Sequence, residues 1–251
     1  MTEHASVKEL ELRAVTRRGD TGEGVKRIQE WLCLNGVRVV IDGRYGAATE
    51  AAVRRYQATV AVAEDGVVSP DLFKRLVLPM RRALDPIPVN GRSLRELVVA
   101  HAQQHLAQHP REVGGQNRGP WVRLYLGGRE GTQWAWCAGF VCFCLRQACD
   151  ALGIAPPIQP SFSCDSLAAS ARKESRFLPE GDRATGLQLA AGSLFLVRRS
   201  AHDWTHTGIV TAVSADHFDT IEGNTNDDGS REGYEVCARV RDYGGKDFVV
   251  I

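Results

Sequence analysis

The sequence predicts an α+β protein: a small all-α domain of three helices, followed by a domain in which helices pack on an antiparallel sheet. Two observations lead to this prediction. Apolar residues recur at helical spacing in the first part of the chain. From residue 186 onward, short β-branched or aromatic runs are separated by Gly, Asn or Asp, which is typical of antiparallel strands, here expected to form a curled sheet. Within the second domain helices come first and strands second, an order typical of α+β folds.

Composition narrows the classes of protein that fit. The 251 residues carry a net charge of +1, which favours neither a nucleic acid nor a membrane partner. No apolar run approaches the roughly 18 residues that span a bilayer. The first twenty residues contain no apolar core of a signal peptide, so synthesis in the cytoplasm without ordinary export is expected. Seven cysteines, an odd number, fit free thiols better than a disulfide framework.

The first domain is predicted over residues 1–78. Its first helix, in "GEGVKRIQEWLCLNG", ends at Asn35-Gly36 and buries one face made of Val25, Ile28, Trp31 and Leu32. A second helix follows in "AATEAAVRRYQATV". A third begins with Ser69 as N-cap and Pro70 in the first turn. The segments "DGRYGAATEAAV" and "DGVVSPDLFKRL" resemble each other as half-repeats of a turn and a helix.

A linker is predicted over residues 79–92, which contain three prolines, and the second domain over residues 93–251. Ser93 and Glu96 form the S-x-x-E pattern of a capping box, for a helix that stops before Pro110. His101 and His105 in this helix have metal-ligand spacing. Since no further ligand is evident, solvated or half-buried histidines are the favoured interpretation, and no metal is expected.

The stretch "TQWAWCAGFVCFCLRQACDAL" (132–152) predicts a buried helix that begins near Cys137. A helix N-terminus lowers a thiol pKa, and the thiolate is the nucleophilic form. Cys142, Cys144 and Cys149 lie inside the helix and are interpreted as small core residues. A zinc cluster is the alternative, but Cys142 and Cys144 point to different helical faces. Position alone leaves it open whether Cys137 is catalytic.

A thiol nucleophile requires a base, and His206 in "DWTHTGIV" is the favoured candidate because it opens an apolar strand. His202 is the competing candidate. Glu222 and Asn224 in "IEGN" are two residues apart, so on a regular strand both face the same side, where either could orient an imidazole. For each residue, a strand-end position without a catalytic role remains the alternative.

These segments resemble a known family. "WCAGFVCFCL", "GSLFLV", "HTGIV" and "IEGNT" are similar to motifs of the CHAP family of cysteine, histidine-dependent amidohydrolases/peptidases, over about residues 94–251. The resemblance implies a papain-like, NlpC-type fold with Cys137 as nucleophile and His206 as base. It also implies Glu222 and Asn224 as polar partners, and leaves open which of them is the third catalytic residue. The Asp-rich calcium segment of some members is absent, so no cofactor is expected.

Residues 12–78 resemble the peptidoglycan-binding type 1 module through "VKRIQEWLCLNG", "DGRYGAATEAAVRRYQ" and "DGVVSPDLFKRL". Together the two resemblances imply a monomeric peptidoglycan hydrolase that cleaves an amide bond in the peptide stem or cross-link. It would reach the cell wall through a phage holin or a secretion machine. Both an N-acetylmuramoyl-L-alanine amidase and an endopeptidase fit the pattern. The alternatives are a cysteine hydrolase of a cytosolic protein and a wall-binding protein with a silent catalytic domain.

Overall fold

The computed structural model describes residues 8–182, 186–226 and 233–251. These residues divide into two compact units. The first comprises the chain up to Leu84 together with Arg111–Thr132, and the second comprises Asp85–Pro110 together with Gln133–Ile251. The division differs from the predicted domains, because residues 111–132 pack with the helices of the first unit. Mixed helices and an antiparallel sheet follow a helical N-terminal part, as the sequence predicts.

The first unit is helical. Its helices are α2 (Glu23–Leu34), α3 (Ala47–Thr59), α4 (Pro70–Leu76), α5 (Leu78–Leu84) and α7 (Pro120–Tyr125). The predicted signals are confirmed: Asn35 caps α2, and Ser69 Oγ accepts a hydrogen bond from Leu72 N at 3.1 Å at the start of α4. The predicted apolar face of α2 is buried. Two buried glutamines fix the turns of the half-repeats.

Each of these glutamines binds the backbone of an Asp-Gly turn. Oε1 of Gln29 accepts hydrogen bonds from the N–H groups of Asp42 and Gly43, at 3.1 and 2.8 Å. Oε1 of Gln57 accepts one from the N–H group of Gly66 at 2.9 Å, and its Nε2 donates to Asp65 at 2.6 Å. Buried polar groups must find partners, so this shared arrangement supports the repeat that the sequence suggests.

The predicted linker over residues 79–92 is partly helical. Helix α5 reaches Leu84, and its residues Met80 and Ala83 are fully buried. The boundary between the two units, after Leu84, falls within this segment. Pro79 lies in the first turn of a helix, where its missing N–H costs no hydrogen bond. The remaining residues, 85–92, are irregular.

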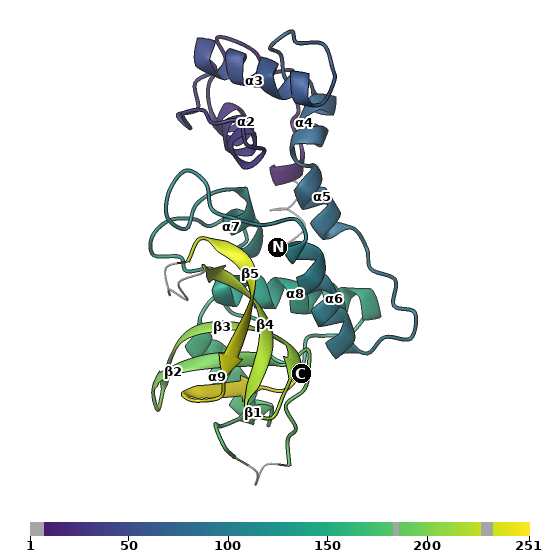
Figure 1. The fold of residues 1–251 in the computed structure, drawn as a ribbon, viewed down its shortest axis with the longest axis vertical. Coiled ribbons are helices and arrows are strands. Elements are labelled where there is room, and N and C mark those ends of the chain that lie inside the picture. Colours follow the sequence, from purple (N-terminus) through teal and green to yellow (C-terminus); the bar gives the residue numbers. More distant parts are fainter. Residues whose placement is uncertain (1–7, 183–185, 227–232) are drawn as a thin grey trace. The chain divides into compact units, whose positions relative to one another are not determined.

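The described part of the second unit contains a six-stranded sheet (Figure 1). Its strands are β1 (Phe177–Leu178), β2 (Leu194–Ser200), β3 (Asp203–Val213), β4 (His217–Thr225), β5 (Glu235–Asp242) and β6 (Lys246–Val249), in the order β1-β6-β2-β3-β4-β5. All neighbouring pairs are antiparallel. Figure 1 shows β4 and β5 turned strongly against β2 and β3, so the predicted curl is present.

The residues described in the second unit also form the helices α6 (Leu94–Leu106), α8 (Cys137–Leu152) and α9 (Cys164–Lys173). The capping box of Ser93 and Glu96 is confirmed at the start of α6. Helix α8 packs against α6, β3 and β4, while α9 packs against β3. A cluster of buried side chains within the sheet consists of Leu178, Phe195, Val210, Phe218, Phe248 and Val250. Among the described residues, no helix is both long and apolar enough to cross a membrane.

Candidate active site

Cys137 is the first residue of α8, directly after its N-cap residue Trp136. Only 3% of Cys137 is exposed, yet the pKa of its thiol lies well below the ordinary value. The hydrogen bond from the Cys164 thiol lowers it most. Burial opposes this shift, while the imidazole of His206 and the backbone N–H of Thr207 reinforce it. Each of these hydrogen-bonding groups favours the thiolate, which is the nucleophilic form.

The other three cysteines of α8 behave in the opposite way. Cys142, Cys144 and Cys149 are buried, and burial raises the pKa of each thiol, to about 11 in the case of Cys142. Cys142 also donates a hydrogen bond to the carbonyl of Ser161 at 3.3 Å. Their interpretation as core residues agrees with this placement. One helix thus contains three inert thiols and one activated thiol, at its N-terminus.

His206 lies on β3, opposite Val197 of β2, and its ring is hydrogen-bonded to Glu222 of β4. Nε2 of His206 and Oε2 of Glu222 are 2.8 Å apart. The strand begins earlier than the sequence suggests, at Asp203, so His206 lies inside β3 rather than at its opening. The exposed His202 lies in the turn before β3. The structure therefore brings His206, and not His202, to Glu222.

The ring of His206 connects a thiol and a carboxylate. Since Nε2 faces Glu222, the buried Nδ1 is the nitrogen left to exchange a proton with Cys137. Burial lowers the pKa of His206, but interactions with Cys137 and Glu222 outweigh it and raise this pKa to about 9. Cys137 and His206 therefore favour a thiolate–imidazolium pair.

Glu222 is held in place by two further side chains. Arg241 of β5 donates from Nε to Oε1 at 2.5 Å and from its terminal nitrogen to Oε2 at 2.6 Å. The hydroxyl of Thr220 donates to Oε1 at 2.6 Å. Burial alone raises the pKa of Glu222, but Arg241 and His206 outweigh burial and lower it to about 2. The carboxylate is consequently ionised near neutral pH, and its orientation is fixed.

Two glycines let β3 and β4 approach their neighbours. A Cβ on Gly208 would lie 2.6 Å from a ring carbon of Phe195 and 2.7 Å from Cγ of Glu222. A Cβ on Gly223 would lie 2.8 Å from the buried ring of Trp136 and 2.7 Å from Cβ of Phe140. The strand that presents Glu222 can therefore contact the start of α8 only with glycine at residue 223.

The structure alters the expectation for Asn224. The β4–β5 pairing is irregular between Glu222 and Thr225, and Asn224 has a positive φ of 57°. Regular alternation along the strand is lost there, so strand geometry does not place Asn224 on the same side as Glu222. Glu222 is the residue bonded to Nε2 of His206. A role for the buried Asn224 stays a prediction.

The histidines of α6 differ from their predicted environment. His101 and His105 are both buried, and burial lowers the pKa of each to about 4, so both are neutral. Nε2 of His105 is bonded to the side-chain amide of Gln147 at 2.8 Å. Among the described residues, no group of three or more His, Cys, Asp or Glu side chains could hold a metal ion.

Sequence reasoning missed two members of the site. Cys164, the first residue of α9, has its Sγ 3.9 Å from Sγ of Cys137. Arg241 reaches Glu222 from the neighbouring strand. For Cys164 no local signal exists. For Arg241 a buried carboxylate on β4 could have indicated the need for a cation nearby, since buried charges are paired.

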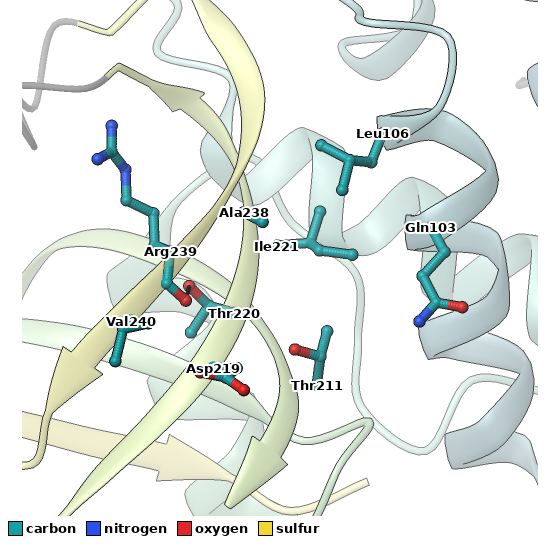
Figure 2. A pocket seen from close by; sticks show the side chains of 9 residues that line it. All are labelled: Gln103, Leu106, Thr211, Asp219, Thr220, Ile221, Ala238, Arg239 and Val240. Carbon is teal, nitrogen blue, oxygen red and sulfur yellow. Dashed lines mark hydrogen bonds between the residues drawn. The ribbon is translucent and has the colours of Figure 1, made fainter.

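A surface pocket of the second unit lies beside the site and not in it. Figure 2 shows its lining residues, Gln103, Leu106, Thr211, Asp219, Thr220, Ile221, Ala238, Arg239 and Val240. Neither Cys137 nor His206 lines it. The guanidinium of Arg239 points away from Gln103 and Thr211 in this view. Thr220 connects the pocket with the site, because its hydroxyl is bonded to Glu222.

Comparison with known proteins identifies the N-terminal part. Residues 21–76 match the model of the peptidoglycan binding domain. The chain is also similar to the zinc D-Ala-D-Ala carboxypeptidase of Streptomyces albus G, with 36% identity over 61 residues, which make up 23% of this chain and 24% of that protein. The chain therefore spans about a quarter of the length of this relative. The protein has an N-terminal peptidoglycan-binding domain and a distant relationship to a peptidase.

The alignment with the carboxypeptidase does not reach across the candidate site. It covers 61 residues, whereas Cys137 and Glu222 are 85 positions apart. The comparisons consequently leave the second unit and its CHAP-like motifs untested. They show a peptidoglycan-binding domain and 61 residues of similarity to a peptidase.

Proposed function

We propose that this protein hydrolyses an amide bond of peptidoglycan, with Cys137 as nucleophile, His206 as acid and base, and Glu222 as the group that orients the imidazole. The observation that carries the proposal is the bonding of His206. Its Nε2 is 2.8 Å from the buried Glu222, so Nδ1 is left for the one thiol of α8 whose pKa is lowered. The proposal includes the papain-like fold that the sequence motifs imply.

In the first step the Cys137 thiolate adds to the carbonyl carbon of the amide, and the carbonyl oxygen becomes an oxyanion. The first N–H groups of α8 have no partner within the helix and are suited to stabilise this charge. The C–N bond then breaks, and the imidazolium of His206 gives its proton from Nδ1 to the leaving amine. The products of this step are a free amine and an acyl-thioester on Cys137.

In the second step His206, now neutral, takes a proton from a water molecule that adds to the thioester carbonyl. The C–S bond breaks, a carboxylic acid leaves, and the thiolate–imidazolium pair is restored. Throughout both steps Glu222 stays ionised, because Arg241 and Thr220 hold its oxygens. It therefore stabilises the imidazolium by its charge and fixes the ring by its hydrogen bond.

The substrate class rests on the binding domain. Residues 21–76 match a peptidoglycan-binding family, and a tethered binding module raises the local concentration of an enzyme on an insoluble polymer. We extend the proposal to action at the cell wall after delivery. The amide that is cut lies in the peptide stem, at the bond that attaches the stem to the sugar chain, or in a cross-link. Hydrolysis at each of these places uses the same chemistry.

The test is digestion of isolated sacculi by the purified chain, followed by mass spectrometry of the soluble products. We expect wild type to release fragments with new free amines. An N-terminal alanine on a free stem indicates an amidase, and an opened cross-link indicates an endopeptidase. Cys137→Ala should lose this activity by several orders of magnitude, whereas Cys142→Ala, in the same helix, should keep it.

Three outcomes would contradict the proposal. Release of the same fragments by Cys137→Ala at the wild-type rate would exclude the thiol mechanism. Binding of wild type to sacculi without any new amine would favour a wall-binding protein with a silent catalytic domain. Failure to bind sacculi at all would favour a hydrolase of another substrate.

A further inference from the structure

Cys164 is a buried thiol that forms no covalent bond in the proposed reaction, although its hydrogen bond lowers the pKa of Cys137. It is the first residue of α9, and Ser163 caps the same helix by accepting a hydrogen bond from Ser166 N at 3.4 Å. Only 7% of Cys164 and 3% of Cys137 are exposed. The two residues are 27 positions apart in the sequence and are brought together by the packing of the second unit.

The distance between the two sulfurs is short enough for a covalent bond after a small movement. Sγ of Cys137 and Sγ of Cys164 are 3.9 Å apart, and all seven cysteines are free thiols. A disulfide requires about 2.05 Å. The sulfurs must therefore approach by roughly 1.9 Å, the difference between these two distances, which a rotation of each side chain about its Cα–Cβ bond can share.

Nucleophilic thiolates are also the thiols that peroxides oxidise, and a neighbouring thiol can convert the first oxidation product into a disulfide. The Cys137 thiolate attacks one oxygen of hydrogen peroxide, the O–O bond breaks, and a sulfenic acid and hydroxide result. The Cys164 sulfur then attacks the sulfenic sulfur, the S–O bond breaks, and a second hydroxide leaves. With the two thiol protons, the hydroxides become two waters, so one peroxide oxidises two thiols to one disulfide.

We infer that Cys164 is a resolving cysteine, which forms a reversible disulfide with Cys137 when a peroxide oxidises the site. The inference rests on the proposed function only in taking Cys137 as the reactive thiol. The disulfide removes the nucleophile and so switches the enzyme off. It also protects Cys137 from oxidation to sulfinic and sulfonic acids, which are irreversible. A dithiol reductant restores both thiols and is itself oxidised to a disulfide.

The other cysteines supply a matched control. Cys142 lies in the same helix as Cys137, but its thiol donates to the carbonyl of Ser161 at 3.3 Å. Cys142→Ser therefore removes one buried thiol and leaves the Cys137–Cys164 pair intact. Cys164→Ser and Cys164→Ala remove the resolving sulfur with and without a hydroxyl in its place. Circular dichroism of each variant shows whether it folds.

The experiment treats the reduced full chain with hydrogen peroxide and maps its tryptic peptides under non-reducing conditions. The peptide of residues 130–146 should be linked to that of residues 147–172, with the loss of two hydrogen atoms. Fragmentation must assign the bond, because Cys142 and Cys144 share the first peptide and Cys149 shares the second. We expect a Cys137–Cys164 bond in wild type and in Cys142→Ser, reversed completely by dithiothreitol.

In Cys164→Ser and Cys164→Ala we expect Cys137 to advance to the sulfinic and sulfonic acids, which dithiothreitol does not reverse. The inference is wrong if wild type shows such overoxidation at the same rate as these variants, or if the disulfide joins two chains or another pair of cysteines. If a Cys164 variant fails to fold, the disulfide map of wild type by itself tests the inference. The readout needs no substrate, so a disulfide without hydrolysis of sacculi would refute the proposed function and leave this inference standing.

Discussion

Replacing Glu222 by Gln tests the link between the imidazole and the carboxylate. The substitution preserves the shape of the side chain and its position on β4, but it removes a negative charge whose oxygen lies 2.8 Å from Nε2 of His206. It also leaves the guanidinium of Arg241, which contacts both carboxylate oxygens, beside a neutral amide. Both changes disfavour the imidazolium.

The size of the effect can be worked out from the geometry. An opposite charge within about 4–6 Å shifts a pKa by roughly 1–3 units, and each unit corresponds to about 1.4 kcal/mol. The pKa of His206 in wild type is about 9, raised by Cys137 and Glu222 against the effect of burial. In Glu222→Gln it should fall by roughly 1–3 units. The pKa of Cys137 should rise at the same time, because the imidazolium that stabilises the thiolate is lost.

The pH dependence of the ion pair has two limits, one for each partner. A lowered thiol pKa keeps the thiolate as the pH falls, and a raised histidine pKa keeps the imidazolium until the pH passes about 9. Wild type should therefore hold the ion pair over a broad range whose alkaline limit is near pH 9. In Glu222→Gln this limit should move to lower pH, and the acid limit should move to higher pH. The pH range of activity becomes narrower from both sides.

The assay is the rate of Cys137 alkylation by iodoacetamide as a function of pH, measured by peptide mass spectrometry. The pH profile of hydrolysis gives a second readout. Asp219→Asn is the matched control, since it removes one carboxylate from the same strand and its alkylation profile should overlay that of wild type. If the profiles of folded Glu222→Gln and wild type coincide, Glu222 does not stabilise the imidazolium, and its assignment is wrong.

Three further substitutions test other residues. His206→Ala should abolish hydrolysis, and it should also abolish the alkylation of Cys137 at low pH. His202→Ala, in an exposed turn, should change neither, and comparison of the two alkylation profiles shows which histidine acts on Cys137. Asn224→Ala should lower kcat less than Glu222→Gln does, because it leaves the Glu222–His206 bond in place; equal losses would contradict this order. Arg123→Ala should lower the free energy of unfolding of the first unit by about 3–5 kcal/mol, because buried carboxylates lose their partner. Urea unfolding measures this loss, and the control Arg55→Ala, at an exposed residue, should have little effect.

The reason for the Arg123 prediction is a buried ion cluster within the first unit. Arg123 of α7 donates to Glu9 at 2.7 Å, to Glu30 at 2.7 Å and to Glu130 at 2.8 Å. Lys26 adds a second cation at 3.0 Å from Glu130. Glu30 is 99% buried, and burial raises its pKa despite Arg123. The cluster joins α7 to the N-terminal helices, which explains why residues 111–132 pack with the first unit.

The sequence by itself determined the local features of this protein, namely its helix caps, its helix starts and its strands, because these depend on residues that are close together in the chain. Caps such as Ser69 and the pair Ser93 and Glu96 are local signals, and each formed the predicted hydrogen bonds. The position of Cys137 at a helix start could be predicted from the apolar run after it. The strands that carry His206 and Glu222 could likewise be predicted, because short β-branched or aromatic runs bounded by Gly, Asn or Asp are a local signal.

Only the tertiary structure decided which distant groups meet. Cys164 lies 3.9 Å from Cys137 because α9 and α8 both pack against β3, and no pattern near either cysteine encodes that packing. Arg241 reaches Glu222 through the pairing of β4 with β5, and register between strands depends on the whole sheet. The irregularity after Glu222 redirects the chain at Asn224, which a regular strand pattern cannot anticipate. Contacts between elements depend on the packing of the whole chain, and spacing within one element does not determine them.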